Sequence, residues 1–234
     1  MCDNAVMFLR KNIICFAAAA AFCAPAFAQS SASEFSPRQR DALRELFAAF
    51  PDAESLRAAR AQIGADIKRR AIAMLHGDDS LPAFGAADGA TIVEFSDYQC
   101  GFCKKMFKVL RAENARIKVV EFPVLGELSV KAARYALAAR DQNGYDAFHI
   151  ALMERGGRLT EDGLEEAAAA AHLDFDRLQR DSENPKISAA LQKNRRLAAM
   201  LEVRGTPFLI IGDRTVPGAI NADRLKNLLN AAAQ

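Results

Sequence analysis

The chain has 234 residues, of which 51% are hydrophobic and 26% are charged, and its formal net charge is +2 at pH 7. This is ordinary globular composition, with enough apolar side chains for a core and a length that allows one large domain or one domain plus an appendage. The nearly balanced charge excludes the strongly basic surfaces by which proteins bind nucleic acids or anionic membranes.

Residues 1–28 have the features of a secretory signal. Arg10 and Lys11 precede an apolar run over residues 13–23, and the segment ends in the tripeptide Ala-Phe-Ala. A basic start, a short apolar centre and small residues at the end predict export, with cleavage after Ala28. The apolar run is too short for a membrane span, which needs roughly 20 residues.

Residues 29–85 form a segment that we call the N-terminal arm. It contains two helical runs, about 36–50 and 55–75, separated by Pro51, and it ends in a Gly- and Asp-rich linker. Ser36 followed by Pro37 predicts the start of the first helix, with Ser as the N-cap. Both runs carry apolar residues at helical spacing but no partner within the segment. We therefore expect the arm to dock on the main domain or to form a homo-oligomer through residues 36–75.

The stretch from Thr91 to Lys105 predicts a strand, a loop and a helix. An apolar, β-branched run ends at Phe95, a polar loop follows, and Cys100-Gly101-Phe102-Cys103 opens a segment with helical apolar spacing. Free N–H groups and the positive end of a helix favour thiolate over thiol, so Cys100 is predicted to be the nucleophile. Cys103 is predicted to resolve mixed disulfides by attacking back.

The cysteine count supports this interpretation. Cys2, Cys15 and Cys23 all lie in the predicted signal, so the mature chain keeps only Cys100 and Cys103. Two cysteines make no disulfide framework, and their spacing suits redox chemistry. A zinc site is not expected, because it needs four ligands and no second cysteine pair is present. Thiol–disulfide exchange without a cofactor is the predicted chemistry.

The rest of the chain predicts an α/β domain over residues 86–234 with a helical insertion at about 129–202. A second strand is expected at 117–122, and apolar runs near the C-terminus predict two more strands and a closing helix. The expected helices of the insertion are 129–141, 144–155, 160–172, 174–181 and 185–202, and the later elements are strands 208–211 and 215–216 and a helix at 221–232. His149 is expected to pack in the interior or lie at the surface.

Several motifs in this region carry a family resemblance. They are Val93–Tyr98, Cys100–Cys103, Glu121–Gly126, Phe148–Met153, Arg204–Phe208, Ile211–Asp213 and Val216–Gly218. In this order, over about residues 91–230, they resemble the DsbA-like branch of the thioredoxin superfamily, closest to the periplasmic ScsC and Com1-type proteins. The resemblance implies a thioredoxin fold with an inserted helical domain, no cofactor, and a periplasmic location.

The resemblance also implies site residues beyond the cysteines. Thr206-Pro207 matches the family's cis-proline loop, which lies opposite the active disulfide and pairs with an extended substrate. Glu94 matches a carboxylate beneath the active site that exchanges protons with the resolving Cys103. Gly101 and Phe102 are expected to tune the redox poise and to contact substrate. The alternatives are that Pro207 merely begins a strand and that Glu94 points into solvent.

The function expected from these features is thiol–disulfide exchange on exported, cysteine-containing proteins, with a DsbD-like or DsbB-like membrane redox partner. Thr206, Gly101 and the N-terminal arm resemble isomerase-like relatives, which favours isomerase or reductase over oxidase. The alternative is a holdase, or a copper-binding module that uses the cysteines as ligands. No nucleic-acid partner is expected.

Overall fold

The computed structural model describes residues 36–49 and 52–232. The predicted signal, residues 1–28, and the Pro51 interruption lie outside the described residues. The chain divides after Ala65 into two compact units. Within the described ranges, no helix is both long and apolar enough to cross a membrane.

The first unit contains helix α3, Pro37–Ala49, and the beginning of α4, Ala53–His76. The Ser36 backbone N–H donates to Gln39 Oε1 (2.8 Å) and the Gln39 N–H donates to Ser36 Oγ (3.4 Å), which confirms Ser36 as the predicted N-cap. Helix α4 begins two residues before its predicted start. Asp52 explains the difference, because its carboxylate accepts from the backbone N–H groups of Glu54 and Ser55.

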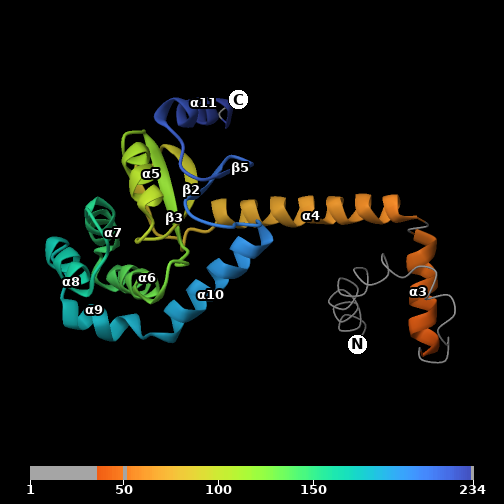
Figure 1. Ribbon diagram of the computed structural model, residues 1–234, viewed down its shortest axis with the longest axis horizontal. Coiled ribbons are helices and arrows are strands. Elements are labelled where there is room, and N and C mark those ends of the chain that lie inside the picture. The colour runs from red at the N-terminus through yellow and green to blue at the C-terminus, as the bar shows by residue number, and fades with distance from the viewer. Residues whose placement is uncertain (1–35, 50–51, 233–234) are drawn as a thin grey trace. The chain divides into compact units, whose positions relative to one another are not determined.

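The second unit is built on a five-stranded mixed sheet (Figure 1). Its strands are β1 Ala83–Gly85, β2 Ala90–Ser96, β3 Ala115–Glu121, β4 Phe208–Ile211 and β5 Arg214–Pro217. The spatial order is β1-β3-β2-β4-β5, in which β2 and β3 are parallel and every other pair is antiparallel. The central pair is largely buried, and its sequence is mainly apolar and β-branched, with Glu94, Lys118 and Glu121 as buried charged exceptions.

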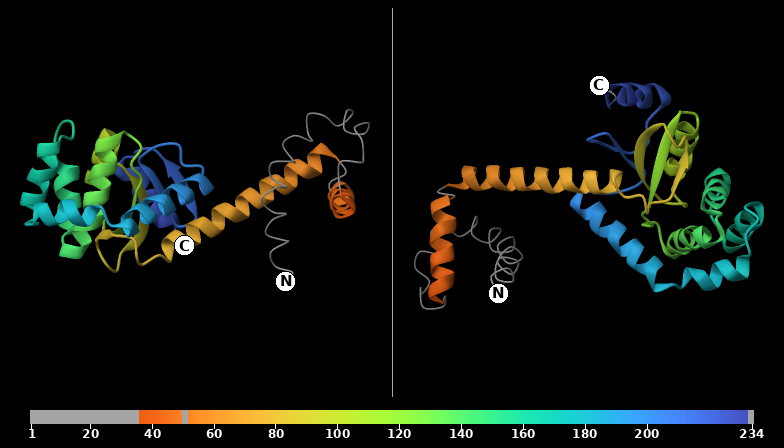
Figure 2. Two further views of the ribbon diagram at one scale, coloured as in Figure 1. Left: turned by 90° about the horizontal axis from the view of Figure 1, so that it is seen from below. Right: turned by 180° about the vertical axis from the view of Figure 1, so that it is seen from behind.

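The helices follow the predicted order with boundary shifts of a few residues. They are α5 Gly101–Arg111, α6 Glu127–Ala139, the 3₁₀ turn Arg140–Gln142, α7 Tyr145–Glu154, α8 Glu161–Ala170, α9 Phe175–Ser182, α10 Pro185–Met200 and α11 Ala222–Ala232. Thr160 and Asn184 cap α8 and α10, since their side-chain oxygens accept hydrogen bonds from the backbone N–H groups of Gly163 and Lys186. Both views in Figure 2 show helices α6 to α10 grouped together beside the sheet.

Each face of the sheet is covered by its own apolar core. Ile92, Ile117 and Leu209 face the larger core, which includes α5, α11 and the helical block. Val93 and Phe95 face the opposite way, into a smaller core that includes the last turns of α4 and α10. Successive side chains of β2 and β3 point to opposite faces of the sheet. One set packs on α5, and the other set packs on the end of α4.

Strand β1 corrects one expectation, because the sequence analysis placed residues 83–85 in the linker. The three residues pair antiparallel with β3, and Phe84 is buried. A run this short cannot show alternation in sequence, so only the tertiary pairing reveals it. The end of α4 also belongs to this unit, since Ala71, Ile72 and Leu75 are buried in the smaller core.

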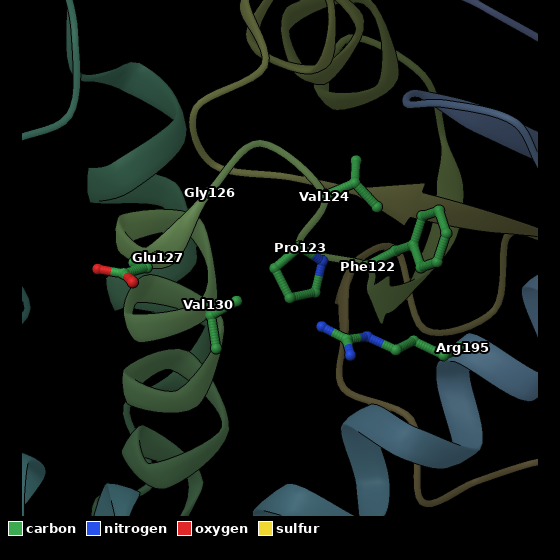
Figure 3. Close-up of a pocket in the computed structure, with 7 residues that line it drawn as sticks. All are labelled: Phe122, Pro123, Val124, Gly126, Glu127, Val130 and Arg195. Atoms are coloured by element: carbon green, nitrogen blue, oxygen red, sulfur yellow. The ribbon is translucent and has the colours of Figure 1, made fainter.

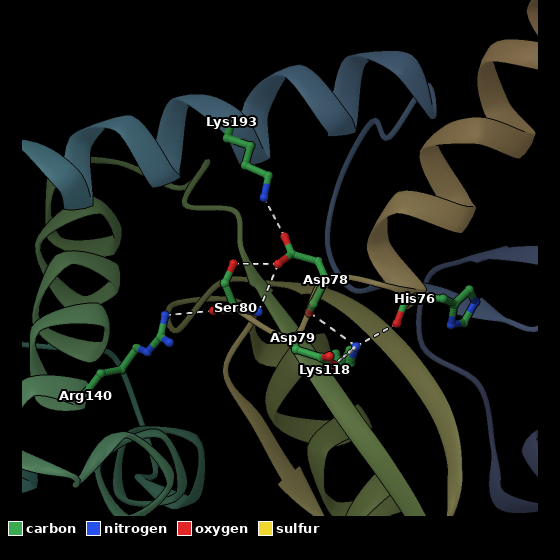
Figure 4. Close-up of polar contacts among 7 residues, drawn as sticks. All are labelled: His76, Asp78, Asp79, Ser80, Lys118, Arg140 and Lys193. Carbon is green, nitrogen blue, oxygen red and sulfur yellow. Dashed lines mark hydrogen bonds and ion pairs between the residues drawn. The ribbon is translucent and has the colours of Figure 1, made fainter.

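A buried lysine fixes the chain between α4 and β1 (Figure 4). Lys118 Nζ donates to the backbone carbonyl oxygens of His76 (2.6 Å) and Asp78 (3.2 Å) and lies 3.3 Å from Asp79 Oδ1. Carbonyl groups at a helix end lack partners within the helix and attract a cation. The same segment is held by Lys193, which pairs with Asp78.

Candidate active site

The two cysteines lie at the start of α5, where the sequence predicts them. Cys100 is the N-cap residue with extended backbone angles (φ −76°, ψ 111°), and Cys103 is the third helical residue. Cys103 is completely buried, whereas Cys100 keeps 7% of its surface exposed. The two thiols therefore differ in access, as nucleophilic and resolving cysteines must.

The pKa values of the two thiols are driven apart. Hydrogen bonding from Cys103 lowers the pKa of Cys100 to about 5, against the opposing effect of burial and with further help from Thr206 and the backbone N–H groups of Cys103 and Phe102. The same contact, then burial and the nearby Glu94 charge, raises the pKa of Cys103 far above the ordinary thiol range. At neutral pH the arrangement supports a Cys100 thiolate beside a protonated Cys103.

Thr206 lies directly against Cys100. The Thr206–Pro207 peptide bond is cis, as the family resemblance implies. Cys100 Sγ is 3.3 Å from the backbone carbonyl oxygen of Thr206. Strand β4 begins at the next residue, Phe208, so this loop joins the sheet at the active site.

Glu94 lies on β2 and is fully buried, which rules out the alternative of a solvent-facing glutamate. Burial raises its pKa to about 8, and the charges of Glu121 and Cys100 act in the same direction, while a hydrogen bond from Ser96 opposes them. The Ser96 bond is long, at 3.4 Å, and Glu94 Oε2 has no hydrogen-bond partner among the described residues. A carboxyl in this state can hold or release a proton near neutral pH.

Asp97, which sequence reasoning did not single out, fixes the loop before Cys100. Its buried carboxylate accepts hydrogen bonds from the Gln99 N–H (2.8 Å) and Ser129 Oγ (2.7 Å). Its other oxygen accepts from the backbone N–H groups of Val124 (2.8 Å) and Leu125 (3.1 Å). The carboxylate therefore ties the loop after β3 to the residues that lead into the active pair.

A second polar group on this side of the sheet was also missed. Glu121, at the end of β3, is buried and accepts hydrogen bonds at Oε1 from the hydroxyls of Tyr98 and Tyr145, each 2.7 Å away. The Tyr98 oxygen also lies 2.9 Å from His149 Nδ1. Glu121 and Tyr98 stand in the motifs quoted above, but nothing in their spacing shows that β3, the loop after β2 and α7 bring these side chains together.

The surface around Cys100 is apolar. Phe102 is 62% exposed, and Val124 and Leu125 are about half exposed on the loop that Asp97 holds. Beside this loop lies an open pocket of about 570 Å³, lined by Phe122, Pro123, Val124, Gly126, Glu127, Val130 and Arg195 (Figure 3).

Comparison with known families supports the resemblance to DsbA-like proteins. A family model for the DSBA-like thioredoxin domain matches residues 91–230. This chain belongs to the DsbA-like family. It is accordingly a thiol–disulfide oxidoreductase with the α/β thioredoxin fold and the inserted helices that the sequence predicts.

Solved structures of several oxidoreductases are similar to this chain. A thioredoxin-like oxidoreductase from Silicibacter pomeroyi is 38% identical, covering 68% of this chain and 95% of its own, with a TM-score of 0.64. The catalytic domain of Proteus mirabilis ScsC is 27% identical, and the match covers 71% of this chain and 99% of that domain, with a TM-score of 0.63. The thiol-disulfide exchange protein α-DsbA2 of Wolbachia pipientis is also 27% identical, and the match covers 74% of this chain and 97% of that protein, with a TM-score of 0.65. No curated protein gives a significant match.

Proposed function

We propose that this DsbA-like protein catalyses thiol–disulfide exchange on exported proteins in the periplasm, with Cys100 as nucleophile, Cys103 as resolving cysteine and Glu94 as the proton acceptor for Cys103. The observation that carries the proposal is the pairing of a low-pKa Cys100 with a buried, protonated Cys103 beside Thr206. The predicted signal supports the location, and one similar structure is described as a periplasmic thioredoxin-like protein from Salmonella enterica.

The proposed chemistry proceeds through a mixed disulfide. The Cys100 thiolate attacks a substrate disulfide, forms a Cys100–substrate bond and releases the other substrate sulfur as a thiolate. In isomerisation, that or another substrate thiolate attacks the mixed disulfide and Cys100 leaves as a thiolate, with no net oxidation. In reduction, Cys103 gives its proton to Glu94 and attacks Cys100 Sγ, so the substrate disulfide is reduced and the enzyme pair is oxidised.

We favour isomerase or reductase over oxidase for this enzyme. The Cys100 thiolate is stabilised mainly by hydrogen bonding from Cys103. The dipeptide Gly101-Phe102 carries no charge that could stabilise it further. A membrane partner of the DsbD type would then keep the pair reduced, whereas a DsbB-type partner would serve an oxidase.

Substrate binding is proposed at Thr206-Pro207 and at the apolar surface of Gly101, Phe102, Val124 and Leu125. An extended substrate that places its sulfur on Cys100 would lie beside the Thr206 backbone and could bond with it as an added strand. Phe102 provides a large apolar contact next to the nucleophile. Backbone pairing and apolar contact both suit unfolded polypeptides of many sequences.

The deciding experiment is reactivation of a scrambled multi-disulfide protein by the reduced mature enzyme, with Cys100→Ser as control. Recovery that depends on Cys100 supports an isomerase. Rapid oxidation of a reduced substrate by the disulfide form, without reactivation, identifies an oxidase. Chaperone function that survives Cys100→Ser, or copper retained on purification, would favour the holdase or metal-binding alternative and overturn the proposal.

We also propose that the N-terminal arm forms homo-oligomers through α4. Ile63, Ile67 and Met74 lie on one face of this helix, because their spacings of four and seven residues match full turns, and they are 57%, 36% and 54% exposed. An exposed apolar stripe of this kind is typical of a helix–helix interface. Light scattering of the mature protein should show an oligomer that Ile63→Asp with Ile67→Asp converts to monomer; a monomeric wild type would end this proposal.

A further inference from the structure

Four buried polar side chains meet on the active-site side of the sheet beside Glu94. Glu121 comes from β3, Tyr98 from the loop after β2, and Tyr145 and His149 from α7. None is more than 5% exposed. We call them the Glu121 cluster. None of them takes part in the exchange steps described above, so their joint burial needs its own explanation.

The hydroxyl of Tyr98 has more acceptors than protons. It lies 2.7 Å from Glu121 Oε1 and 2.9 Å from His149 Nδ1, and it can donate to only one of them. When Glu121 is ionised, both tyrosines donate to Oε1, and the Nδ1–H of His149 donates to the Tyr98 oxygen. When Glu121 is protonated, it donates to the Tyr98 oxygen, Tyr98 donates to Nδ1, and His149 carries its proton on Nε2.

The two arrangements differ by one proton and satisfy the same hydrogen bonds among the four side chains; His149 Nε2 has no hydrogen-bond partner among the described residues in either of them. Starting from ionised Glu121, a proton bound at His149 Nε2 lets the Nδ1 proton move to the Tyr98 oxygen while the Tyr98 proton moves to Glu121. The Nδ1–H bond of His149 and the O–H bond of Tyr98 break. An Nε2–H bond on His149, a new O–H bond on Tyr98 and an O–H bond on Glu121 form, which accounts for the added proton. Only protons move, so no oxidant or reductant takes part. His149 stays neutral in both arrangements, in agreement with the burial that lowers its pKa to about 3.

Glu121 and Glu94 occupy one apolar layer. Ser96 is the register partner of Glu121, and Ser96 Oγ also hydrogen-bonds to Glu94, so the two carboxyls lie on neighbouring strands and face the same side. Glu94 Oε2 and Glu121 Oε2 both lack hydrogen-bond partners within the described part of the chain. Two negative charges in this layer repel each other, so the carboxyls ionise as a coupled pair.

We propose that Glu121 is a positioning residue of the exchange reaction: it gains and loses a proton together with Tyr98 and His149, and its charge controls how readily Glu94 accepts the proton of Cys103. This inference rests on the proposed function. Other polar groups face Glu121 from each neighbouring element: Glu94 and Ser96 from β2, Asp97 from the loop after it, Tyr145 from α7, and Asn194 of α10, which donates to the Glu121 backbone carbonyl.

The first test separates the two cysteines by their reaction with the aromatic disulfide DTNB. The first equivalent of coloured thiol reports attack by Cys100, and the second reports attack by Cys103 on the mixed disulfide. We expect Glu121→Gln to leave the pH midpoint of the first phase unchanged. The midpoint of the second phase should move down by ~1 pH unit, because Glu94 then ionises without a competing charge.

The second test is ¹⁵N NMR of histidine-labelled enzyme, with His149 identified by comparison with His76→Gln and His172→Gln variants. Wild-type His149 should change from the Nε2–H to the Nδ1–H form as pH rises through the ionisation of Glu121, and it should remain neutral throughout. In Glu121→Gln the form should not change with pH. Tyr98→Phe, which keeps the ring but breaks the link to His149, provides a second variant should Glu121→Gln fail to fold.

Lys118→Met is the matched control, since it removes a buried charge from the opposite face of the same strand. Its second-phase midpoint should equal that of the wild type. The proposal is overturned if Glu121→Gln and wild type have superimposable second-phase profiles, or if His149 keeps one form at all pH values. Failure of the wild-type enzyme to exchange disulfides with a protein substrate would instead overturn the proposed function, and the NMR result would still report on the Glu121 cluster.

Discussion

Lys118 and Glu121 lie three residues apart on β3, and both are buried, but their side chains are on opposite faces of the sheet. Glu121 meets Tyr98 and Tyr145 on the face that carries the active pair. Lys118 binds the carbonyl oxygen of His76 at the end of α4, on the other face. One strand therefore supports the chemistry on one side and the attachment of α4 on the other, and the two roles can be tested separately.

Lys118→Met should loosen the end of α4 without affecting the exchange chemistry. The substitution keeps a long apolar side chain but leaves the carbonyls of His76 and Asp78 without their donor, at a cost of about 1–3 kcal/mol in the free energy of unfolding. Chemical denaturation and limited proteolysis within residues 77–81 would measure it. Lys193→Met is the control: this lysine is 45% exposed and pairs with the single residue Asp78 within the described part of the chain, so its loss should cost less than about 1 kcal/mol. Equal losses for both variants would contradict the prediction.

The sequence predicts the strand, loop and helix around Cys100 because local signals coincide there: an apolar β-branched run, a polar loop and helical spacing. It also predicts Thr206-Pro207 at the site, through the family motif. The Glu121 cluster could not be predicted, because its four members come from three separate segments and no local pattern records their contact. Residues 83–85 were missed for a related reason, since a three-residue edge strand exists only through its pairing with β3.

Cys103→Ser should trap substrates on Cys100. The Cys100 thiolate can still form the mixed disulfide, but the serine hydroxyl cannot attack it, so only a substrate thiol or an external thiol can resolve it and the adduct lives longer. Non-reducing gels of the variant mixed with a scrambled protein should show an adduct that a reductant releases. Cys100→Ser should give no such adduct, since Cys103 is buried and its pKa is raised. An adduct of similar yield in both variants would show that Cys100 is not the entry point.

Phe102→Ala should weaken action on protein substrates while sparing small ones. The side chain is 62% exposed beside Cys100, so its removal subtracts apolar contact with a polypeptide but leaves the thiol's hydrogen bonds in place. We expect kcat/KM for a scrambled protein to fall by about three- to tenfold, equivalent to roughly 1 kcal/mol of lost contact. The rate with DTNB should change by less than twofold. Val109→Ala, on the same helix and away from the pair, is a control for general effects on α5.

Glu94→Gln should change how stability depends on pH, in a direction set by burial. The folded protein holds the Glu94 proton up to a pKa of about 8, whereas the unfolded chain releases it near 4.5. Between these values the folded state binds more protons, so this group makes the wild type less stable as pH rises, by at most about 1.4 kcal/mol per pH unit. The glutamine cannot ionise, so the stability of the variant relative to wild type should increase from pH 4.5 to pH 8 and level off above it. Urea denaturation at several pH values measures this difference, and contributions from other groups, such as His149, largely cancel in it. A constant difference over the whole range would show that burial does not hold the Glu94 proton up to pH 8.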